Sequence, residues 1–274
     1  MGPWGPGYPR HGTKMQEAIA NLPRAGRGSI AYRRQMGREN AAGTHAQPGL
    51  MFLGGFMSDM TGTKAEWLEG FAAARRLPYL RFDYSGHGRS QGNFTDGTIG
   101  TWLADALDVF DHLTEGPQVL AGSSMGGWIA LLLALQRPER VRGIVGIAAA
   151  PDFTEDLIHR ELDNTQRDTL MRDGILHLPS EYAETPYAIT RQLIEEGRNH
   201  LLLQDAIPIA CPVHLVHGQM DRDVPWQTAI RIMERIEGPQ VCATFIKDGD
   251  HRLSREADLA RIGAAIADVI GSGL

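Results

Sequence analysis

The sequence is poor in the features that would place it outside the ordinary globular proteins. It has two cysteines in 274 residues, Cys211 and Cys242, each close to a predicted strand, so nothing supports a disulfide framework and a reducing compartment is expected. No window approaches eighteen consecutive apolar residues, which argues against a membrane span. The net charge of −6 is spread without blocks of one sign, so no electrostatic footprint for nucleic acid or an anionic membrane is present.

Signs of a bound metal or cofactor are also missing from the sequence. No group of His, Cys, Asp and Glu shows the spacing of metal ligands, and the glycine-rich stretches do not match the phosphate-binding fingerprints. We therefore predict no metal and no cofactor. What is present is length and apolar content, with 42% hydrophobic residues, which suffices for the core of one large α/β domain.

The N-terminal stretch "MGPWGPGYPRHGTKM" is rich in Gly and Pro and lacks the apolar region of a secretory signal. Residues 1–38 carry several Arg and almost no acid, as organelle transit peptides do, but they contain one serine, Ser29, and no evident amphipathic helix. We predict that residues 1–28 form a disordered tail and that residues 29–274 form the folded domain.

The remaining chain alternates short β-rich runs with helical patterns, which predicts a mostly parallel, doubly wound sheet with crossover helices. Thr63 and Glu66 match a capping box at the start of one helix. Between residues 151 and 210 no strand pattern occurs and helical periodicity dominates, so this interval is predicted to be an inserted helical lid. The predicted strands are 29–33, 49–53, 79–82, 118–121, 141–148, 213–216 and 243–246.

The stretch "VLAGSSMGGWIALLLAL" carries the pattern G-x-S-x-G between a predicted strand and a predicted helix. In this context Ser124 is expected at a sharp, strained turn, and glycines on either side avoid a collision between strand and helix. The pentapeptide alone would also fit a plain glycine-rich turn, but the flanking pattern favours a nucleophile. Ser123 stands one place too early in the glycine frame and is interpreted as a structural neighbour.

A serine nucleophile needs a general base and a carboxylate that orients the base, and after such an elbow they follow in the order acid, then histidine. "LVHGQMDRDVPW" places Asp221 beyond a strand, and "FIKDGDHRLS" places His251 beyond the last one. Both loops belong to the carboxyl ends of parallel strands, where open α/β sheets build their sites. Asp223 is the competing carboxylate, and His87 in "DYSGHGRS" precedes the nucleophile and is interpreted as a loop residue.

A tetrahedral intermediate also requires donors for its oxyanion. The N–H of Met125, directly after the nucleophile, is one predicted donor. The other is expected from "FLGGFMSDMTGTKA", where the N–H of Phe56 follows a glycine pair. A simple Gly-Gly turn is the alternative interpretation of that pair.

These motifs together resemble the α/β-hydrolase superfamily over the chain from about residue 29. More narrowly, "MSDMTGTKA", "RFDYSGHG", "GSSMGGW", "CPVHLVHGQMDRDVPW" and "DHR" resemble the mitochondrial palmitoyl-protein thioesterases, also described as acyl-glucuronide esterases, and their bacterial relatives. The resemblance implies an α/β-hydrolase fold, a Ser124–Asp221–His251 triad and hydrolysis of esters or thioesters through an acyl-enzyme. Because the N-terminus has a Gly/Pro tail in place of a clear transit sequence, we expect a bacterial cytoplasm rather than a mitochondrial matrix.

Two other classes of function stay open. A peptidase of the same fold would use the same triad, and a binding module on a hydrolase scaffold would be expected to lack a triad member. We expect a small-molecule or acylated substrate and a monomer or homodimer. The lid has an apolar stripe whose members are more often core-facing than substrate-facing: Leu157, Ile158, Leu162, Leu170, Ile175, Leu176, Tyr182, Tyr187, Ile189 and Leu193.

Overall fold

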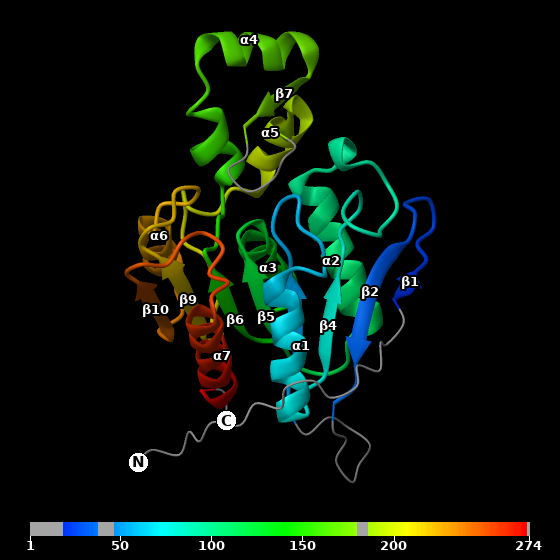
Figure 1. Ribbon diagram of the computed structural model, residues 1–274, viewed down its shortest axis with the longest axis vertical. Helices are drawn as coiled ribbons and strands as arrows, with labels where there is room; N and C mark the ends of the chain where they lie inside the picture. The colour runs from blue at the N-terminus through cyan, green and yellow to red at the C-terminus, as the bar shows by residue number, and fades with distance from the viewer. Residues whose placement is uncertain (1–18, 38–46, 180–185, 273–274) are drawn as a thin grey trace.

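The structure, a computed structural model, describes residues 19–37, 47–179 and 186–272. An eight-stranded sheet with the order β1-β2-β4-β3-β5-β6-β9-β10 forms its centre (Figure 1). The first two strands pair antiparallel at one edge and the other strands are parallel. The strands are β1 (Ala20–Leu22), β2 (Ile30–Gln35), β3 (Gly49–Leu53), β4 (Tyr79–Phe82), β5 (Gln118–Ser123), β6 (Val141–Ile147), β9 (Val213–Gly218) and β10 (Val241–Ile246).

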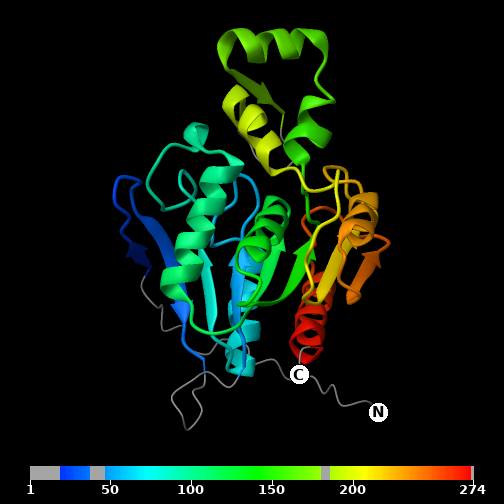
Figure 2. The ribbon, with the colours of Figure 1, turned by 180° about the vertical axis from the view of Figure 1, so that it is seen from behind.

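Helices cover both faces of this sheet, which confirms the predicted α/β architecture. Helices α1 (Thr63–Arg75) and α7 (Glu256–Gly271) lie on the face turned to the viewer in Figure 1. The opposite face, seen in Figure 2, carries α2 (Ile99–Leu113), α3 (Met125–Gln136) and α6 (Gln227–Arg235). A short 3₁₀ helix, Phe94–Asp96, precedes α2.

Each face of the sheet packs into its own core, because successive side chains of a strand point to opposite faces. Along β3, Met51 and Leu53 join the cluster under α2, α3 and α6, whereas Leu50 and Phe52 join the cluster under α1 and α7. Since both faces are covered, these strands are apolar throughout rather than alternating. The sequence showed them clearly for that reason, and β3 and β4 have the predicted bounds.

The segment between β6 and β9, residues 151–210, stands above the carboxyl ends of the parallel strands (Figure 1) and is called the lid segment below. It was predicted to be all-helical, but it also contains an antiparallel pair of strands, β7 (Ile175–Leu178) and β8 (Tyr187–Thr190). These four-residue strands interrupt the helical pattern too briefly to show as a period of two. Its helices are a π-helical turn (Thr154–His159), α4 (Asn164–Asp173), α5 (Arg191–Gly197) and a 3₁₀ turn (Arg198–His200).

Two local expectations differ from the structure. The boundary at residue 29 is too late, because β1 already pairs with β2 through residues 20–22, while residues 1–18 lie outside the described part of the chain. The capping box at Thr63 is also not formed: Gly62 is the N-cap of α1 and makes no side-chain cap, and Thr63 is already helical. In both places a three- or four-residue pattern was too short to fix the local structure.

Candidate active site

Ser124 lies between the end of β5 and the start of α3, with a φ of 54° and a ψ of −119°. A non-glycine residue rarely takes such a φ, and the conformation persists only where the surroundings enforce it. Here the backbone is held on both sides: the Ser124 N–H donates to the carbonyl of Ile147, and its carbonyl accepts from Gly127 and Ala150. The hydroxyl is therefore carried on a strained, well-fixed turn, as predicted from the G-x-S-x-G pattern.

The glycines of this turn have a measurable steric reason. A Cβ on Gly122 would lie 2.3 Å from the carbonyl oxygen of Gly126, and a Cβ on Gly126 would lie 2.1 Å from that of Leu53. Real Cβ atoms do not approach backbone atoms so closely, so any side chain would push strand and helix apart. The elbow can form only with glycine at both positions.

The two loops that carry Asp221 and His251 lie against each other at the same edge of the sheet. The chain after β9 and the chain after β10 are joined by backbone bonds from Gln219 N to Ile246 O (2.8 Å) and from Met220 N to Gly249 O (2.9 Å). Residue 218 is a glycine where the chains meet, since a Cβ there would lie 2.3 Å from the Gly249 oxygen. The pairing brings the Asp221 carboxylate within 2.8 Å of His251 Nδ1.

The Asp221 carboxylate is fully buried, and both of its oxygens accept hydrogen bonds. His251 Nδ1 and His217 Nε2 approach Oδ2 at 2.8 and 3.2 Å, while the N–H groups of Asp223 and Val224 donate to Oδ1. Burial alone would raise the pKa of this carboxyl, but the hydrogen bonds from the two histidines and Val224 outweigh it and hold the pKa well below its usual range. The side chain of Asp221 is therefore ionised at neutral pH.

His217 was interpreted from the sequence as a packed turn residue, yet its ring contacts the same carboxylate oxygen as His251. Its Nε2 also donates to the carbonyl of Val224 at 3.0 Å, so it ties the Asp221 loop at two points. The spacing of His217 and Asp221, four residues apart across a turn, could have suggested the contact. The competing Asp223 contributes its backbone N–H to Asp221 rather than its carboxylate to His251.

Ser124 and His251 border one cavity of about 420 Å³ at the carboxyl edge of the sheet. Its floor includes Ser123, the last residue of β5, and its lining is mixed, with polar groups near Lys64 and Arg252. Lys64 donates to the carbonyl of Arg252 and so fastens α1 to the loop of His251, and burial lowers the pKa of Lys64 to about 8. A cavity of this size falls within the range of small-molecule sites.

Of the two predicted oxyanion donors, Phe56 lines the same cavity, and Met125 directly follows Ser124 in the chain. Met125 occupies the first position of α3, where a helix leaves the N–H without an intrahelical acceptor. Phe56 lies in a turn closed by the bond from Ser58 N to Gly55 O, and a Cβ on Gly55 would lie 3.4 Å from the Cβ of Ser124. The loop of Phe56 therefore lies close to the predicted nucleophile, at a distance where a side chain at position 55 would make an ordinary van der Waals contact.

Within the described ranges, two groups of side chains bring three metal-ligating atoms within 4.8 Å of one another. One consists of Asp221, Asp223 and His251, which belong to the network just described. The other, His214 with Cys242 and Asp268, joins β9, β10 and α7 away from the cavity. Sequence spacing could not find it, because its members come from three elements. Two of its members, Cys242 and Asp268, are exposed, and none of the three borders the cavity of Ser124.

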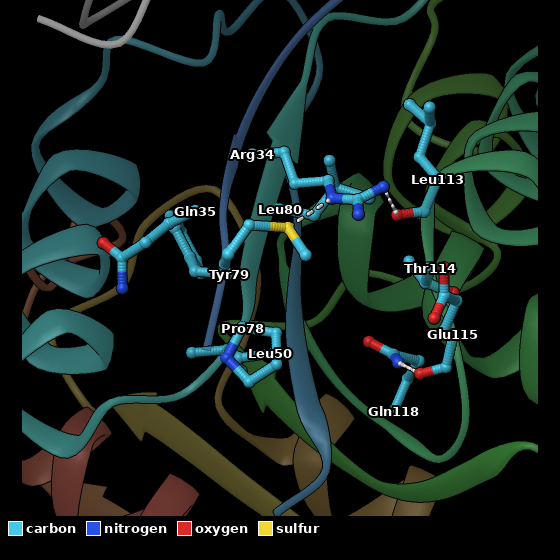
Figure 3. A pocket seen from close by; sticks show the side chains of 11 residues that line it. Arg34, Gln35, Leu50, Pro78, Tyr79, Leu80, Leu113, Thr114, Glu115 and Gln118 are labelled. Carbon is cyan, nitrogen blue, oxygen red and sulfur yellow. Dashed lines mark hydrogen bonds between the residues drawn. The ribbon is translucent and has the colours of Figure 1, made fainter. Parts of the chain in front are cut away.

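A second hollow lies at the opposite edge of the sheet, by the amino ends of β3, β4 and β5 (Figure 3). Leu50, Tyr79 and Gln118 line it, with Arg34 across from them. Its volume of about 20 Å³ holds little more than one water molecule. It therefore offers no room for a substrate.

Comparisons with known proteins agree with the architecture. A family profile described as "Alpha/beta hydrolase family" matches residues 48–262. The "Palmitoyl-protein thioesterase ABHD10, mitochondrial" of Mus musculus is 38% identical over 94% of this chain and 84% of its own, and that of Homo sapiens is 34% identical over 94% and 81%. A solved structure of the mouse protein has a TM-score of 0.85 at 37% identity over 93% and 99% of the two chains. A crystal structure described as a "Putative hydrolase from Agrobacterium vitis S4" has a TM-score of 0.86 at 41% identity over 92% of this chain and 98% of that chain.

One expectation is corrected by these relatives. The sequence led us to expect a bacterial cytoplasm, but the curated proteins that match nearly the whole chain are named as mitochondrial, and this finding contradicts the expectation. The absence of a clear transit sequence was too weak a signal to decide the location. Among the helices that the structure describes, none has the length and apolar character needed to cross a membrane.

The matched family profile spans most of the chain, and the relatives at 34–38% identity share most of their own length with it. The chain belongs to the alpha/beta hydrolase family and is a hydrolase.

Proposed function

We propose that the protein hydrolyses carboxylic esters or thioesters, with Ser124 as nucleophile, His251 as general base and Asp221 as the carboxylate that orients the base. The observation that carries this proposal is the 2.8 Å contact of His251 Nδ1 with the buried Asp221, beside a strained serine that borders the same cavity. With Nδ1 donating to a carboxylate, Nε2 of the neutral ring is left to accept a proton.

The proposed reaction has two halves. In acylation, His251 removes the proton of the Ser124 hydroxyl as its oxygen attacks the carbonyl carbon, and the N–H groups of Phe56 and Met125 stabilise the oxyanion. The bond to the leaving oxygen or sulfur then breaks, and the leaving group takes the proton from His251. In deacylation a water molecule repeats these steps on the acyl-enzyme and releases the acid.

The lid segment is proposed to cover the site and to select the acyl part of the substrate. Four members of its apolar stripe form one cluster with Ile194, namely Leu162, Leu170, Leu176 and Ile189, whereas Leu193 belongs to the larger core under α2 and α3. Of the described lid residues, Tyr187 lines the cavity and its ring lies 6.0 Å from that of Phe56. Tyr182, another member of the predicted stripe, lies outside the described residues.

The relatives named palmitoyl-protein thioesterases support an acyl thioester as the substrate class. The quality of the leaving group supports it as well. Thioesters and aryl esters, which leave readily, are expected to react before simple amides. A peptidase of the same fold is the alternative, and no particular contact of the cavity favours it.

The test is kcat/KM for acyl thioesters and p-nitrophenyl esters of two to sixteen carbons, beside the matching amides. Purified protein should turn over the thioesters and esters, with longer chains preferred over acetyl. Efficient cleavage of unactivated peptide amides without esterase activity would reject the substrate class. A strong preference for acetyl over every longer chain would reject the role of the lid segment.

A further inference from the structure

The turn after β4, residues 83–90, packs against the loop that carries Phe56. Two of its side chains accept hydrogen bonds from the backbone of that loop: Asp83 Oδ1 from the N–H of Met60 at 2.6 Å, and His87 Nε2 from the N–H of Met57 at 3.3 Å. The two N–H donors, of Met57 and Met60, are three residues apart in the chain, and Met57 directly follows the predicted oxyanion donor, Phe56. From the sequence, His87 is predicted to be an ordinary loop residue.

The protonation state of the His87 ring follows from its two partners. Its Nδ1 lies 3.2 Å from the carbonyl oxygen of Ser85, which can only accept, so Nδ1 carries the hydrogen. Nε2 is then a lone-pair acceptor and faces a backbone donor, Met57 N–H. Burial lowers the pKa of His87, against opposite effects of the Ser85 carbonyl and the Asp105 carboxylate, and so favours this neutral form.

Met57 is a residue that needs such support. It has a φ of 56°, at the third position of the turn closed by Ser58 N and Gly55 O, where glycine is the preferred residue. A methionine in this conformation stores about 1 kcal/mol of strain or more. The Phe56 N–H lies in the peptide directly before the one that carries the Met57 N–H, and both belong to the turn closed by Ser58 N and Gly55 O, so relaxation at Met57 would turn the Phe56 N–H as well.

The two acceptors are themselves fixed. The His87 ring is 3% exposed and makes edge-to-face contacts with the rings of Tyr84, Phe94 and Trp102. Asp83 is 2% exposed, and its second oxygen accepts from the N–H of Arg89 at 2.8 Å. A Cβ at position 88 would lie 2.2 Å from that oxygen, which explains the glycine between them.

We propose that His87, assisted by Asp83, is a positioning residue for catalysis: its Nε2 holds the Met57 N–H and thereby fixes the strained turn that aims the Phe56 N–H at the oxyanion. This inference rests on the proposed function. It gives the "DYSGHG" turn a role in the reaction without contact to the substrate, since the clamp acts through the backbone of residues 56–60.

The test replaces the acceptor while keeping the ring. His87→Phe retains an aromatic side chain among Tyr84, Phe94 and Trp102 but cannot accept from Met57. Because a misplaced oxyanion donor costs about 10²-fold in rate, kcat for a p-nitrophenyl ester should fall about 10²-fold with KM within about threefold of wild type. His87→Gln, whose amide offers both an acceptor and a donor, should recover most of the loss.

A second readout separates positioning from general packing. An alkyl boronic acid forms a tetrahedral adduct with a serine nucleophile and mimics the oxyanion, whereas the product carboxylic acid mimics the ground state. In His87→Phe the Ki of the boronic acid should rise by the same factor as kcat falls, and the Ki of the product acid should stay within about threefold. Tyr84→Phe is the matched control, because the Tyr84 hydroxyl is buried without a hydrogen-bond partner in the described structure, and this variant should keep both constants.

The outcomes are distinguishable. If His87→Phe does not fold, His87→Asn, whose amide is one methylene shorter than that of Gln, takes its place and should show the same losses. Wild-type kcat and boronic acid affinity in the folded variants would overturn the positioning role, as would an equal loss of affinity for boronic and carboxylic acids. Wild-type protein that neither hydrolyses esters nor binds the boronic acid at Ser124 would overturn the proposed function, and the positioning role with it.

Discussion

The carboxyl edge of the sheet and the lid segment face the same cavity but are built in different ways. At the sheet edge each predicted site residue is held by short backbone links, as where Gln219 and Met220 bond across to the chain of His251, and the Asp221 carboxylate is completely buried. The lid segment has a small core of its own and joins the main core through Phe153, Leu193 and Leu203. Ion pairs at partly exposed positions, such as Arg231–Asp156 and Arg198–Glu155, join its parts to each other and to α6.

This difference indicates that the two regions have different roles. Chemistry that depends on tenths of an ångström needs groups that cannot move, and the sheet edge supplies them. Selection of an acyl chain tolerates looser contacts. The small core of the lid segment and its partly exposed ion pairs are adequate for that task. Substitutions at the sheet edge should therefore change rates by orders of magnitude, and substitutions in the lid segment should change preferences by small factors.

The largest expected effect is at the nucleophile. Ser124→Ala should lower kcat for any ester substrate by about 10⁴-fold or more, because triad members act as a unit, with the melting temperature nearly unchanged. Ser123→Ala, the neighbour on β5, is the control and should cost far less. Steady-state kinetics with both variants decide this, and equal losses at the two serines would remove the distinction made by the elbow.

Asp221→Asn should follow, with a loss in kcat of about 10³- to 10⁴-fold, because an amide no longer stabilises the protonated His251 and can favour the wrong tautomer. Asp223→Asn should be mild, since Asp223 gives its backbone N–H to the network. The same kinetic assay compares the two variants. The reverse ranking would identify Asp223 as the functional carboxylate.

The buried Asp221 also predicts a pH dependence of stability. A carboxyl whose folded pKa lies below its unfolded value stabilises the fold above the unfolded pKa, about 4, and loses that contribution as the pH falls through the folded pKa. The free energy of unfolding of wild type, relative to Asp221→Asn, should shrink as the pH falls below about 4. Urea titrations of both proteins measure it, and a difference that grows as the pH falls below about 4 would contradict the depressed pKa of Asp221.

The elbow glycine offers a test of rigidity rather than chemistry. Gly126→Ala should destabilise the fold by about 3 kcal/mol, because the new methyl group meets the carbonyls of Leu53 and Gly54 and neither backbone can move freely. Gly70→Ala in α1 meets nothing within 4 Å and should stabilise the helix by about 1 kcal/mol. Denaturant unfolding measures the change in the free energy of unfolding for both variants. Changes of the same sign would refute the steric account.

The smallest expected effect lies in the lid segment. Tyr187→Ala should lower kcat/KM about 3- to 10-fold for long acyl chains and hardly at all for acetyl, because it removes one aromatic wall beside Phe56. Tyr187→Phe should retain the preference. An acyl-chain series with the three proteins makes the comparison, and a uniform loss of 10²-fold or more for every chain would place Tyr187 with the catalytic groups instead.

The same contrast explains what the sequence could predict. Buried parallel strands are continuous apolar runs, so β3 and β4 were placed with their observed bounds, and the loops after β9 and β10 followed from them. The pairing of Asp221 with His251 could be expected because both follow neighbouring strands. β1, β7 and β8 were missed, since strands of three or four residues in partly exposed positions leave no periodicity.

The contacts of His87 and His217 were missed for another reason. His87 meets a backbone N–H thirty residues earlier in the chain, at a methionine whose positive φ no local pattern announces. His217 shares the Asp221 carboxylate with His251 and had looked like a packing residue. Contacts between a side chain and distant backbone depend on the tertiary structure, and single-residue patterns do not encode them.

The most direct test of the central claim is covalent labelling of the wild-type protein with a fluorophosphonate, followed by peptide mass spectrometry. We predict a single phosphonyl adduct on Ser124, formed much more slowly in Asp221→Asn and absent from Ser124→Ala. An adduct on another residue, or full esterase activity in a protein that the reagent does not label, would contradict the assignment of Ser124 as the nucleophile.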